Sequence, residues 1–200
     1  LSPGKKILEI AAGSGGPDDF MIKKTACHLT GIDINENGVT SAKQMAEENG
    51  LTEQLDFRLA DASLPLPFPD GTFDAIISID SINHLKSRNS VLKEFNRVLK
   101  HGGILLFTDP MIITGIVTNE EIAIRTSIGF FLIVPVGENE LLLNEAGFSK
   151  IISKDVTDNM ALVSLKWYNA RENRRDELLK IEDSDNFNGL QSFFKMVNTL

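Results

Sequence analysis

Short apolar runs alternate with helical stretches over the first 110 residues, and this alternation constrains the fold more than any other feature of the sequence. Five runs have the length and composition of strands: residues 5–11, 28–34, 55–60, 73–79 and 103–108. Residues 75–79 are apolar at nearly every position, which is typical of strands covered on both faces. Strands that alternate with helices form βαβ units. The sequence therefore predicts an α/β fold with a doubly wound, mostly parallel sheet.

The stretches between these runs carry helix signals. Pro17 suits the first turn of a helix that is expected to run to about residue 27. A second helix is expected to end at Asn49 and Gly50. Residues 87–100 place apolar side chains at helical spacing and predict a third helix.

After Asp109 the pattern weakens. It predicts helices over 120–126, 138–146 and 159–181 and a sixth strand over 148–153. The longest of these helices is expected to turn five side chains toward the body of the protein: Leu162, Leu165, Tyr168, Leu178 and Leu179. The final twenty residues give no clear signal.

Composition excludes several classes of protein. The 200 residues carry a net charge of −8, which works against binding nucleic acid or an anionic membrane. A single cysteine, Cys27, and three histidines exclude a disulfide scaffold and a structural zinc site of the usual spacing. The longest apolar stretch, 128–136, is too short to span a bilayer. We therefore expect a cytoplasmic protein that acts on a small molecule.

The turn after the first run limits the ligand. Residues 12–16 are small, but the third glycine of a dinucleotide fingerprint would stand at position 18, where the chain has Asp18. Asp18 and Asp19 would repel a pyrophosphate at the helix N-terminus, and no Gly-Lys-Ser/Thr of a phosphate-binding loop follows. The ligand is therefore expected to lack a polyphosphate. A nicotinamide-dependent oxidoreductase on the same sheet remains the alternative.

Acidic residues stand at or near the ends of the first four predicted strands: Glu9, Asp33, Asp61 and Asp80. Asp33 follows Gly13 by 20 residues, the spacing at which a carboxylate binds the hydroxyls of a ribose. Because parallel strands end at one edge of a sheet, these acids are expected to gather there. They suit a cationic nucleoside with an amino-acid tail, with Glu9 near its ammonium group and Asp61 near its adenine amino group.

Residues 7–17 (ILEIAAGSGGP), 31–34 (GIDI), Asp61-Ala62 and 98–103 (VLKHGG) together resemble the class I S-adenosylmethionine-dependent methyltransferase family, over residues 1 to about 181. The resemblance implies the cofactor S-adenosylmethionine, with S-adenosylhomocysteine as product and no metal. It implies ten cofactor-binding positions: Glu9, Ala11, Gly13, Ser14, Gly15, Asp33, Ile34, Asp61, Ala62 and Ile79. The family usually has glycine at position 11, and we expect the Ala11 methyl to be tolerated against the strands.

Residues 80–85 (DSINHL) and 153–158 (SKDVTD) are similar to the methyltransferases of small amines, which act on phosphoethanolamine or on sarcosine and dimethylglycine. This similarity implies catalytic roles for His84 and Asp80, although a histidine after a strand is often only a hydrogen-bonded loop residue. Pro110 replaces the aromatic residue that binds the phosphobase, which speaks against phosphoethanolamine. Trp167 and Tyr168 are assigned to core packing rather than to cation–π contacts with the acceptor.

The sequence thus predicts one domain over residues 1–200, with residues 110–136 forming the acceptor pocket. By the resemblance, a cap helix lies before Leu1 and a final antiparallel strand after Leu200, so the chain is expected to be truncated at both ends. The predicted activity is methyl transfer to a small molecule, with an amine nitrogen as acceptor. A cofactor-binding module without catalysis is the further alternative, and the sequence leaves the oligomeric state open.

Overall fold

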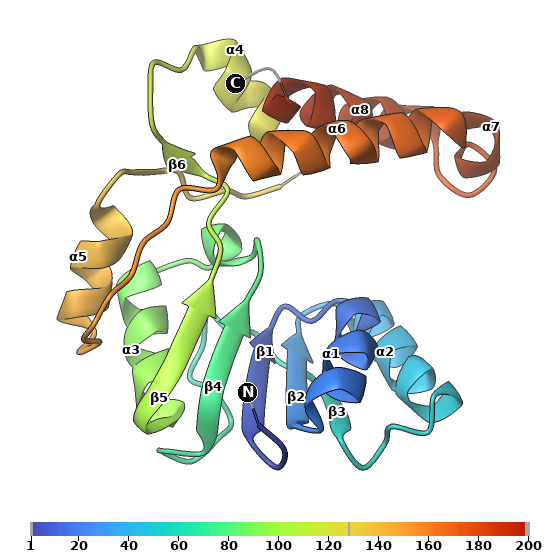
Figure 1. The fold of residues 1–200 in the computed structure, drawn as a ribbon. Coiled ribbons are helices and arrows are strands. Elements are labelled where there is room, and N and C mark those ends of the chain that lie inside the picture. The colour runs from blue at the N-terminus through green and yellow to red at the C-terminus, as the bar shows by residue number, and fades with distance from the viewer. Residues whose placement is uncertain (1, 128, 199–200) are drawn as a thin grey trace. The chain divides into compact units, whose positions relative to one another are not determined.

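The computed structural model describes residues 2–127 and 129–198. The chain divides into two compact units (Figure 1). The first comprises Leu1–Asp109 and Gly137–Ile151, and the second comprises Pro110–Val136 and Ile152–Leu200.

The first unit is built on a parallel sheet whose strand order is β3-β2-β1-β4-β5. Its strands are β1 (Lys6–Ile10), β2 (His28–Asp33), β3 (Leu55–Leu59), β4 (Phe73–Ser78) and β5 (Leu99–Phe107). Each ends within one residue of its predicted end. The chain winds outward from β1 to β3 and then returns to add β4 and β5, so the strand order reverses between β1 and β4. The predicted doubly wound fold is confirmed.

Helices cover both faces of this sheet (Figure 1). On one face lie α1 (Gly16–Thr25) and α2 (Glu36–Glu48), and on the other lie α3 (Arg88–Val98) and α5 (Glu138–Glu145). The alternation along β1 sends Ile7 to the α1 and α2 side and Leu8 to the α3 side, where both are fully buried. Glu9 therefore shares the face of Ile7, under α1.

Helix starts follow local sequence signals. The side chain of Asn35 caps α2 by accepting hydrogen bonds from the backbone N–H groups of Asn37 and Gly38. Gly15 precedes α1 with φ 75°, a left-handed conformation that glycine adopts without strain. A short 3-10 helix, η1 (Ile82–His84), links β4 to α3.

The second unit combines a short parallel strand pair with four helices. These elements are β6 (Ile112–Ile113), α4 (Asn119–Arg125), β7 (Val134–Pro135), α6 (Thr157–Asn173), α7 (Arg175–Leu178) and α8 (Ser184–Asn198). Helices α6 and α8 lie side by side (Figure 1), and the Ser164 hydroxyl donates to the Phe194 carbonyl at 2.8 Å. Thr118 and Glu121 form a capping box at α4, in the segment predicted to be helical.

Two predictions for the C-terminal half are wrong. Residues 148–153, all of which the structure describes, form no strand: Lys150 has φ 56°, which interrupts an extended backbone, and Ile152 is 92% exposed. The helix predicted over 159–181 breaks at Arg174, and its Leu162 and Leu165 are exposed instead of buried. Apolar residues lie around α6 instead of along one stripe, so the sequence pattern gave no reliable inward face.

Within the described residues, none of the helices combines the length and the apolar character that a bilayer span requires.

Candidate functional site at the carboxyl ends of the strands

The candidate site lies at the edge of the sheet where β1 and β4 end. Ile10, the last residue of β1, pairs with Ile32 on one side and with Ser78 on the other. The segments that follow these strands therefore start level with one another. Open parallel sheets bind ligands at this kind of position, where the strand order reverses.

The turn after β1 approaches its neighbours closely. The Ala12 N–H donates to the Ile32 carbonyl at 3.1 Å, which holds the turn against β2. A Cβ on Gly15 would lie 2.8 Å from the Cε of Met45. The same Cβ would lie 2.9 Å from Phe57 Cζ and 3.1 Å from Ala42 Cβ, so packing requires a glycine at position 15. At Gly13, which has φ 57°, a Cβ would meet no described atom within 4 Å. The space where a Gly13 side chain would lie is open, although the Gly13 N–H is bonded to Asp33.

The expectation for Ala11 is wrong. Ala11 does not face the strands: it is exposed, and it has φ 58°. A left-handed conformation costs a residue with a Cβ on the order of 1–2 kcal/mol. Glycine suits this position because of its backbone, not because of the space around its side chain.

Asp33 connects the end of β2 to the turn after β1. Its Oδ2 accepts a hydrogen bond from the Gly13 N–H and its Oδ1 accepts one from the Asn35 N–H, both at 2.8 Å. The side chain is half-buried, and each carboxylate oxygen has a further lone pair for a ligand hydroxyl. The adjacent Ile34 is exposed and offers apolar surface at the same edge.

The third predicted acid forms a local turn. Asp61 Oδ1 accepts a hydrogen bond from the Ser63 N–H at 2.8 Å, while Ala62 between them is buried. The Ala60 N–H donates to the Asp33 carbonyl at 2.9 Å, so the segment after β3 is attached directly to the end of β2.

Glu9 and Asp18 form a buried pair of carboxyl groups. Glu9 is 8% exposed and Asp18 is fully buried. Among the described residues, no N–H or hydroxyl group donates to either Asp18 oxygen or to the Oε2 of Glu9. The two carboxyl groups are close enough to form a hydrogen bond with each other. Burial, and secondarily the neighbouring Asp18, raises the pKa of Glu9 to about 9, and burial also raises the pKa of Asp18.

The segment after β4 carries the predicted acceptor-side residues. Asp80 has φ 49° and is fixed by Thr108: the Thr108 hydroxyl donates to Asp80 Oδ1 at 2.6 Å and accepts from the Asp80 N–H at 2.8 Å. Ile79 and Asp80 are exposed. His84 is also exposed and closes η1, with its backbone N–H donating to the Ser81 carbonyl at 3.0 Å.

A buried polar network after β5 was not predicted from the sequence. Arg88 Nη1 donates to Asp109 Oδ2 and to Asn139 Oδ1, each at 2.7 Å, and Asn139 Nδ2 donates to Asp109 Oδ2 at 3.0 Å. The network joins the starts of α3 and α5 to the end of β5. A signal was present, because Asp109 is a fifth acid at a strand end, but the sequence did not identify its partners.

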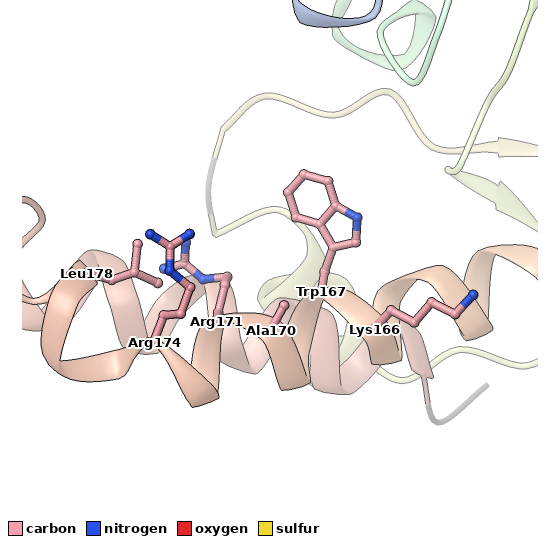
Figure 2. A pocket seen from close by; sticks show the side chains of 6 residues that line it. All are labelled: Lys166, Trp167, Ala170, Arg171, Arg174 and Leu178. Atoms are coloured by element: carbon pink, nitrogen blue, oxygen red, sulfur yellow. The ribbon is translucent and has the colours of Figure 1, made fainter.

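An open depression of about 410 Å³ lies in the second unit, outside the unit that carries the sheet (Figure 2). Its lining residues come from α6, from Arg174 between the two helices, and from α7: Lys166, Trp167, Ala170, Arg171, Arg174 and Leu178. Arg171 pairs with Glu182 and Arg174 with Glu177. Trp167 is 58% exposed, so its assignment to core packing is wrong.

The chain has clear relatives. A family model described as a methyltransferase domain matches residues 8–107. Phosphoethanolamine N-methyltransferase 1 of Zea mays is 32% identical over 179 residues, which cover 90% of this chain and 35% of the relative. Sterol 24-C-methyltransferase ERG6B of Gibberella zeae is 42% identical over 104 residues, which cover 52% of this chain and 27% of the relative.

A solved structure agrees with the fold. Haemonchus contortus phosphoethanolamine N-methyltransferase 2, in complex with phosphomonomethylethanolamine and S-adenosylhomocysteine, gives a TM-score of 0.89 at 21% identity, over 100% of this chain and 46% of that one. At 21% identity this comparison shows a shared fold and nothing further.

The chain spans about a third of the length of the curated relatives it matches. The family model covers half of the chain, including the turn after β1 and the ends of all five strands of the sheet. The chain therefore belongs to the methyltransferase-domain family, in the S-adenosylmethionine-dependent class I that its motifs predict.

Proposed function

We propose that the protein binds S-adenosylmethionine at the carboxyl edge of its sheet and transfers the methyl group to a small molecule, with an amine nitrogen as acceptor. The observation that carries this proposal is the buried Glu9, which lies beside the buried Asp18 and whose Oε2 accepts no N–H or hydroxyl hydrogen bond among the described residues. Two adjacent buried carboxyl groups can both ionise only beside a cation, and the cofactor brings an ammonium group to this end of β1.

The remaining residues suit the other parts of the cofactor. Asp33 is fixed by two backbone N–H groups and keeps lone pairs for the two ribose hydroxyls. Gly13 leaves open space beside the turn, and the exposed Ile34 offers apolar contact to an adenine ring. Asp61 stands at the end of β3, on the adenine side of Asp33. Ala11, Ser14, Ala62 and Ile79 complete the proposed binding residues.

The acceptor side is assigned to Asp80 and His84. The cofactor supplies a methyl carbon bonded to a sulfonium, and transfer requires the acceptor to be held in line with that bond. Asp80, immobilised by Thr108, would bind the amine as it approaches. An amine attacks only after losing its proton, and the exposed imidazole of His84 would accept that proton.

The sterol 24-C-methyltransferase likeness favours a second candidate, a carbon acceptor. Nicotinamide chemistry on this sheet is disfavoured, because Asp18 stands where the dinucleotide fingerprint requires its third glycine.

Calorimetric titration with S-adenosylhomocysteine tests cofactor binding. Asp33→Ala is expected to weaken binding by at least about tenfold, since a hydrogen bond to a charged group contributes about 1.5–3 kcal/mol. Asp56→Ala is the matched control, because Asp56 is an exposed aspartate on β3 that pairs only with Arg58 among the partners seen here. Absence of binding by the folded wild-type protein would refute the proposal, and thermal stabilisation by NAD would favour the oxidoreductase.

Turnover of methyl-labelled S-adenosylmethionine against amines, sterols, thiols and carboxylates tests the acceptor. Transfer to an amine supports the proposal, and transfer to a sterol supports the second candidate. Cofactor binding without transfer to any acceptor class would identify a binding module.

A further inference from the structure

We propose that Asp18 is a second carboxyl group of the cofactor's ammonium site, and that Glu9 and Asp18 share a proton which leaves when the ammonium group binds. This inference rests on the proposed function and deepens it. Asp18 is not among the binding residues that the family motifs imply. The inference predicts how many protons the protein releases when the cofactor binds.

The local fold brings the two carboxyl groups together. Glu9 lies on the β1 face that α1 covers, and Asp18 lies in the first turn of that helix. Both side chains are at least nine-tenths buried, and three of their four oxygens accept no N–H or hydroxyl hydrogen bond among the described residues. The two carboxyl groups are close enough to hydrogen-bond each other, but one shared proton satisfies at most one oxygen on each, so the pair still lacks donors.

Other charged groups near the pair are already engaged. Asp19, the next residue of α1, forms an ion pair with Lys23 at 2.6 Å. The strands beside β1 end in Asp33, which accepts two backbone hydrogen bonds, and in the segment of Asp80, which is bonded to Thr108. Glu9 and Asp18 therefore have no cation supplied by these neighbours.

Such a pair holds at most one negative charge in the free protein. Two adjacent buried carboxylates repel each other, and each is costly to desolvate. The partial positive charge of the α1 N-terminus favours one anion, at Asp18. Burial and the neighbouring Asp18 raise the pKa of Glu9 to about 9, so Glu9 keeps its proton at neutral pH.

An incoming ammonium group changes this balance. It donates N–H bonds to the unpartnered oxygens and neutralises the second negative charge, so the carboxyl O–H of Glu9 ionises and its proton passes to the buffer. The protein with its singly protonated Glu9–Asp18 pair therefore binds the cofactor and releases one proton to the buffer. Affinity for a ligand with an ammonium group should increase with pH, whereas affinity for the same nucleoside without the amino-acid tail should not.

Two ligands, one with an ammonium group and one without it, test this prediction in the wild-type protein. S-adenosylhomocysteine carries the ammonium group, and 5′-methylthioadenosine has the same nucleoside without the amino-acid tail. Titrations in phosphate and in Tris buffer, which differ in ionisation enthalpy, measure proton release. We expect about one proton released per S-adenosylhomocysteine, an affinity that rises by up to about tenfold per pH unit between about pH 6 and 9, and neither effect with 5′-methylthioadenosine.

Variants then test whether Asp18 is responsible for the proton release. Asp18→Asn should reduce the proton release and flatten the pH dependence of S-adenosylhomocysteine binding, with little effect on 5′-methylthioadenosine. Asp19→Asn is the matched control, because it changes the neighbouring charge in the same helical turn and should leave both properties unchanged. Thermal melts verify that each variant is folded.

The outcomes are distinct. S-adenosylhomocysteine that binds the wild-type protein with no proton release and no pH dependence would overturn this inference and leave the proposed function standing. The same pH dependence for both ligands would also overturn it. Failure of both ligands to bind would instead refute the proposed function.

Discussion

Replacing Arg88 by methionine tests the buried network after β5. Arg88 is 2% exposed, and the side chain of its partner Asp109 is 1% exposed. Arg88→Met would leave Asp109 as a buried carboxylate without its guanidinium, with the Asn139 amide still donating to it at 3.0 Å. Removing one member of a buried ion pair costs about 3–5 kcal/mol. For a chain of this size the melting temperature should therefore fall by roughly 6–20 °C.

The exposed pair of Arg58 and Asp56 supplies the control. It has a similar N–O distance, 2.6 Å against 2.7 Å, but about half of each side chain is exposed. Arg58→Met should therefore cost less than about 1 kcal/mol. Urea unfolding followed by circular dichroism measures both variants.

A double variant separates charge burial from lost packing. Arg88→Met with Asp109→Asn removes both charges, so it should be more stable than Arg88→Met alone. The energy is assigned to a buried carboxylate that has lost its guanidinium partner. This assignment would be refuted if Arg88→Met cost no more than Arg58→Met, or if the double variant were no more stable than Arg88→Met.

Three further predictions concern the turn after β1 and the buried acids. Ala11→Gly should raise the free energy of unfolding by a few tenths to about 1 kcal/mol in urea unfolding, because it removes left-handed strain at φ 58° but adds freedom to the unfolded chain. Gly15→Ala should lower it by about 2–4 kcal/mol, because the new Cβ would be strained at φ 75° and would lie 2.9 Å from Phe57 Cζ and 3.1 Å from Ala42 Cβ. The free energy of unfolding of the ligand-free protein should fall as pH rises from 4.5 toward about 9, because burial raises the pKa of Glu9 and of Asp18 in the folded state and the unfolded chain releases these protons first. The slope should be at most about 1.4 kcal/mol per pH unit for each proton, and Asp18→Asn should reduce it, as urea unfolding at several pH values would measure.

The sheet was predictable chiefly because its inner strands, β2, β1 and β4, are buried on both faces, whereas the edge strands β3 and β5 are partly exposed. The inner strands are nearly continuous apolar runs that end at turn residues. The carboxyl end of every strand lies within one residue of its predicted end, but β5 begins at Leu99, four residues before its predicted start. Residues 148–153 have a similar composition, but the left-handed Lys150 interrupts them. The sequence did not signal this interruption, since lysine has no special preference for that conformation.

Only those features of the site that follow from a residue's position at the end of a strand were predictable from the sequence. Asp33 and Asp61 stand at the ends of parallel strands, and topology alone brings strand ends to one edge. The direction of a side chain depends on packing instead. The sequence places Asp18 in the first turn of a helix, but nothing in the sequence shows that the structure buries it against Glu9. The pairing of Arg88 with Asp109 joins residues 21 positions apart, which no local pattern reveals.

Asp80 and Ala11 are left-handed residues that follow strands β4 and β1 within two residues, and they differ in what offsets their strain. Asp80 has φ 49°, and its carboxylate and its N–H both bond to the Thr108 hydroxyl, so the surrounding structure stabilises the conformation and fixes the carboxylate. Ala11 has φ 58° and a methyl side chain that makes no hydrogen bond. Where hydrogen bonds of the side chain stabilise a left-handed backbone, as at Asp80, replacing that side chain would remove the stabilisation. Where the side chain makes no such bonds, as at Ala11, glycine can replace the residue and relieve the strain. This distinction supports Asp80 as part of the acceptor site and explains why Ala11, alone of the two, should gain stability from glycine.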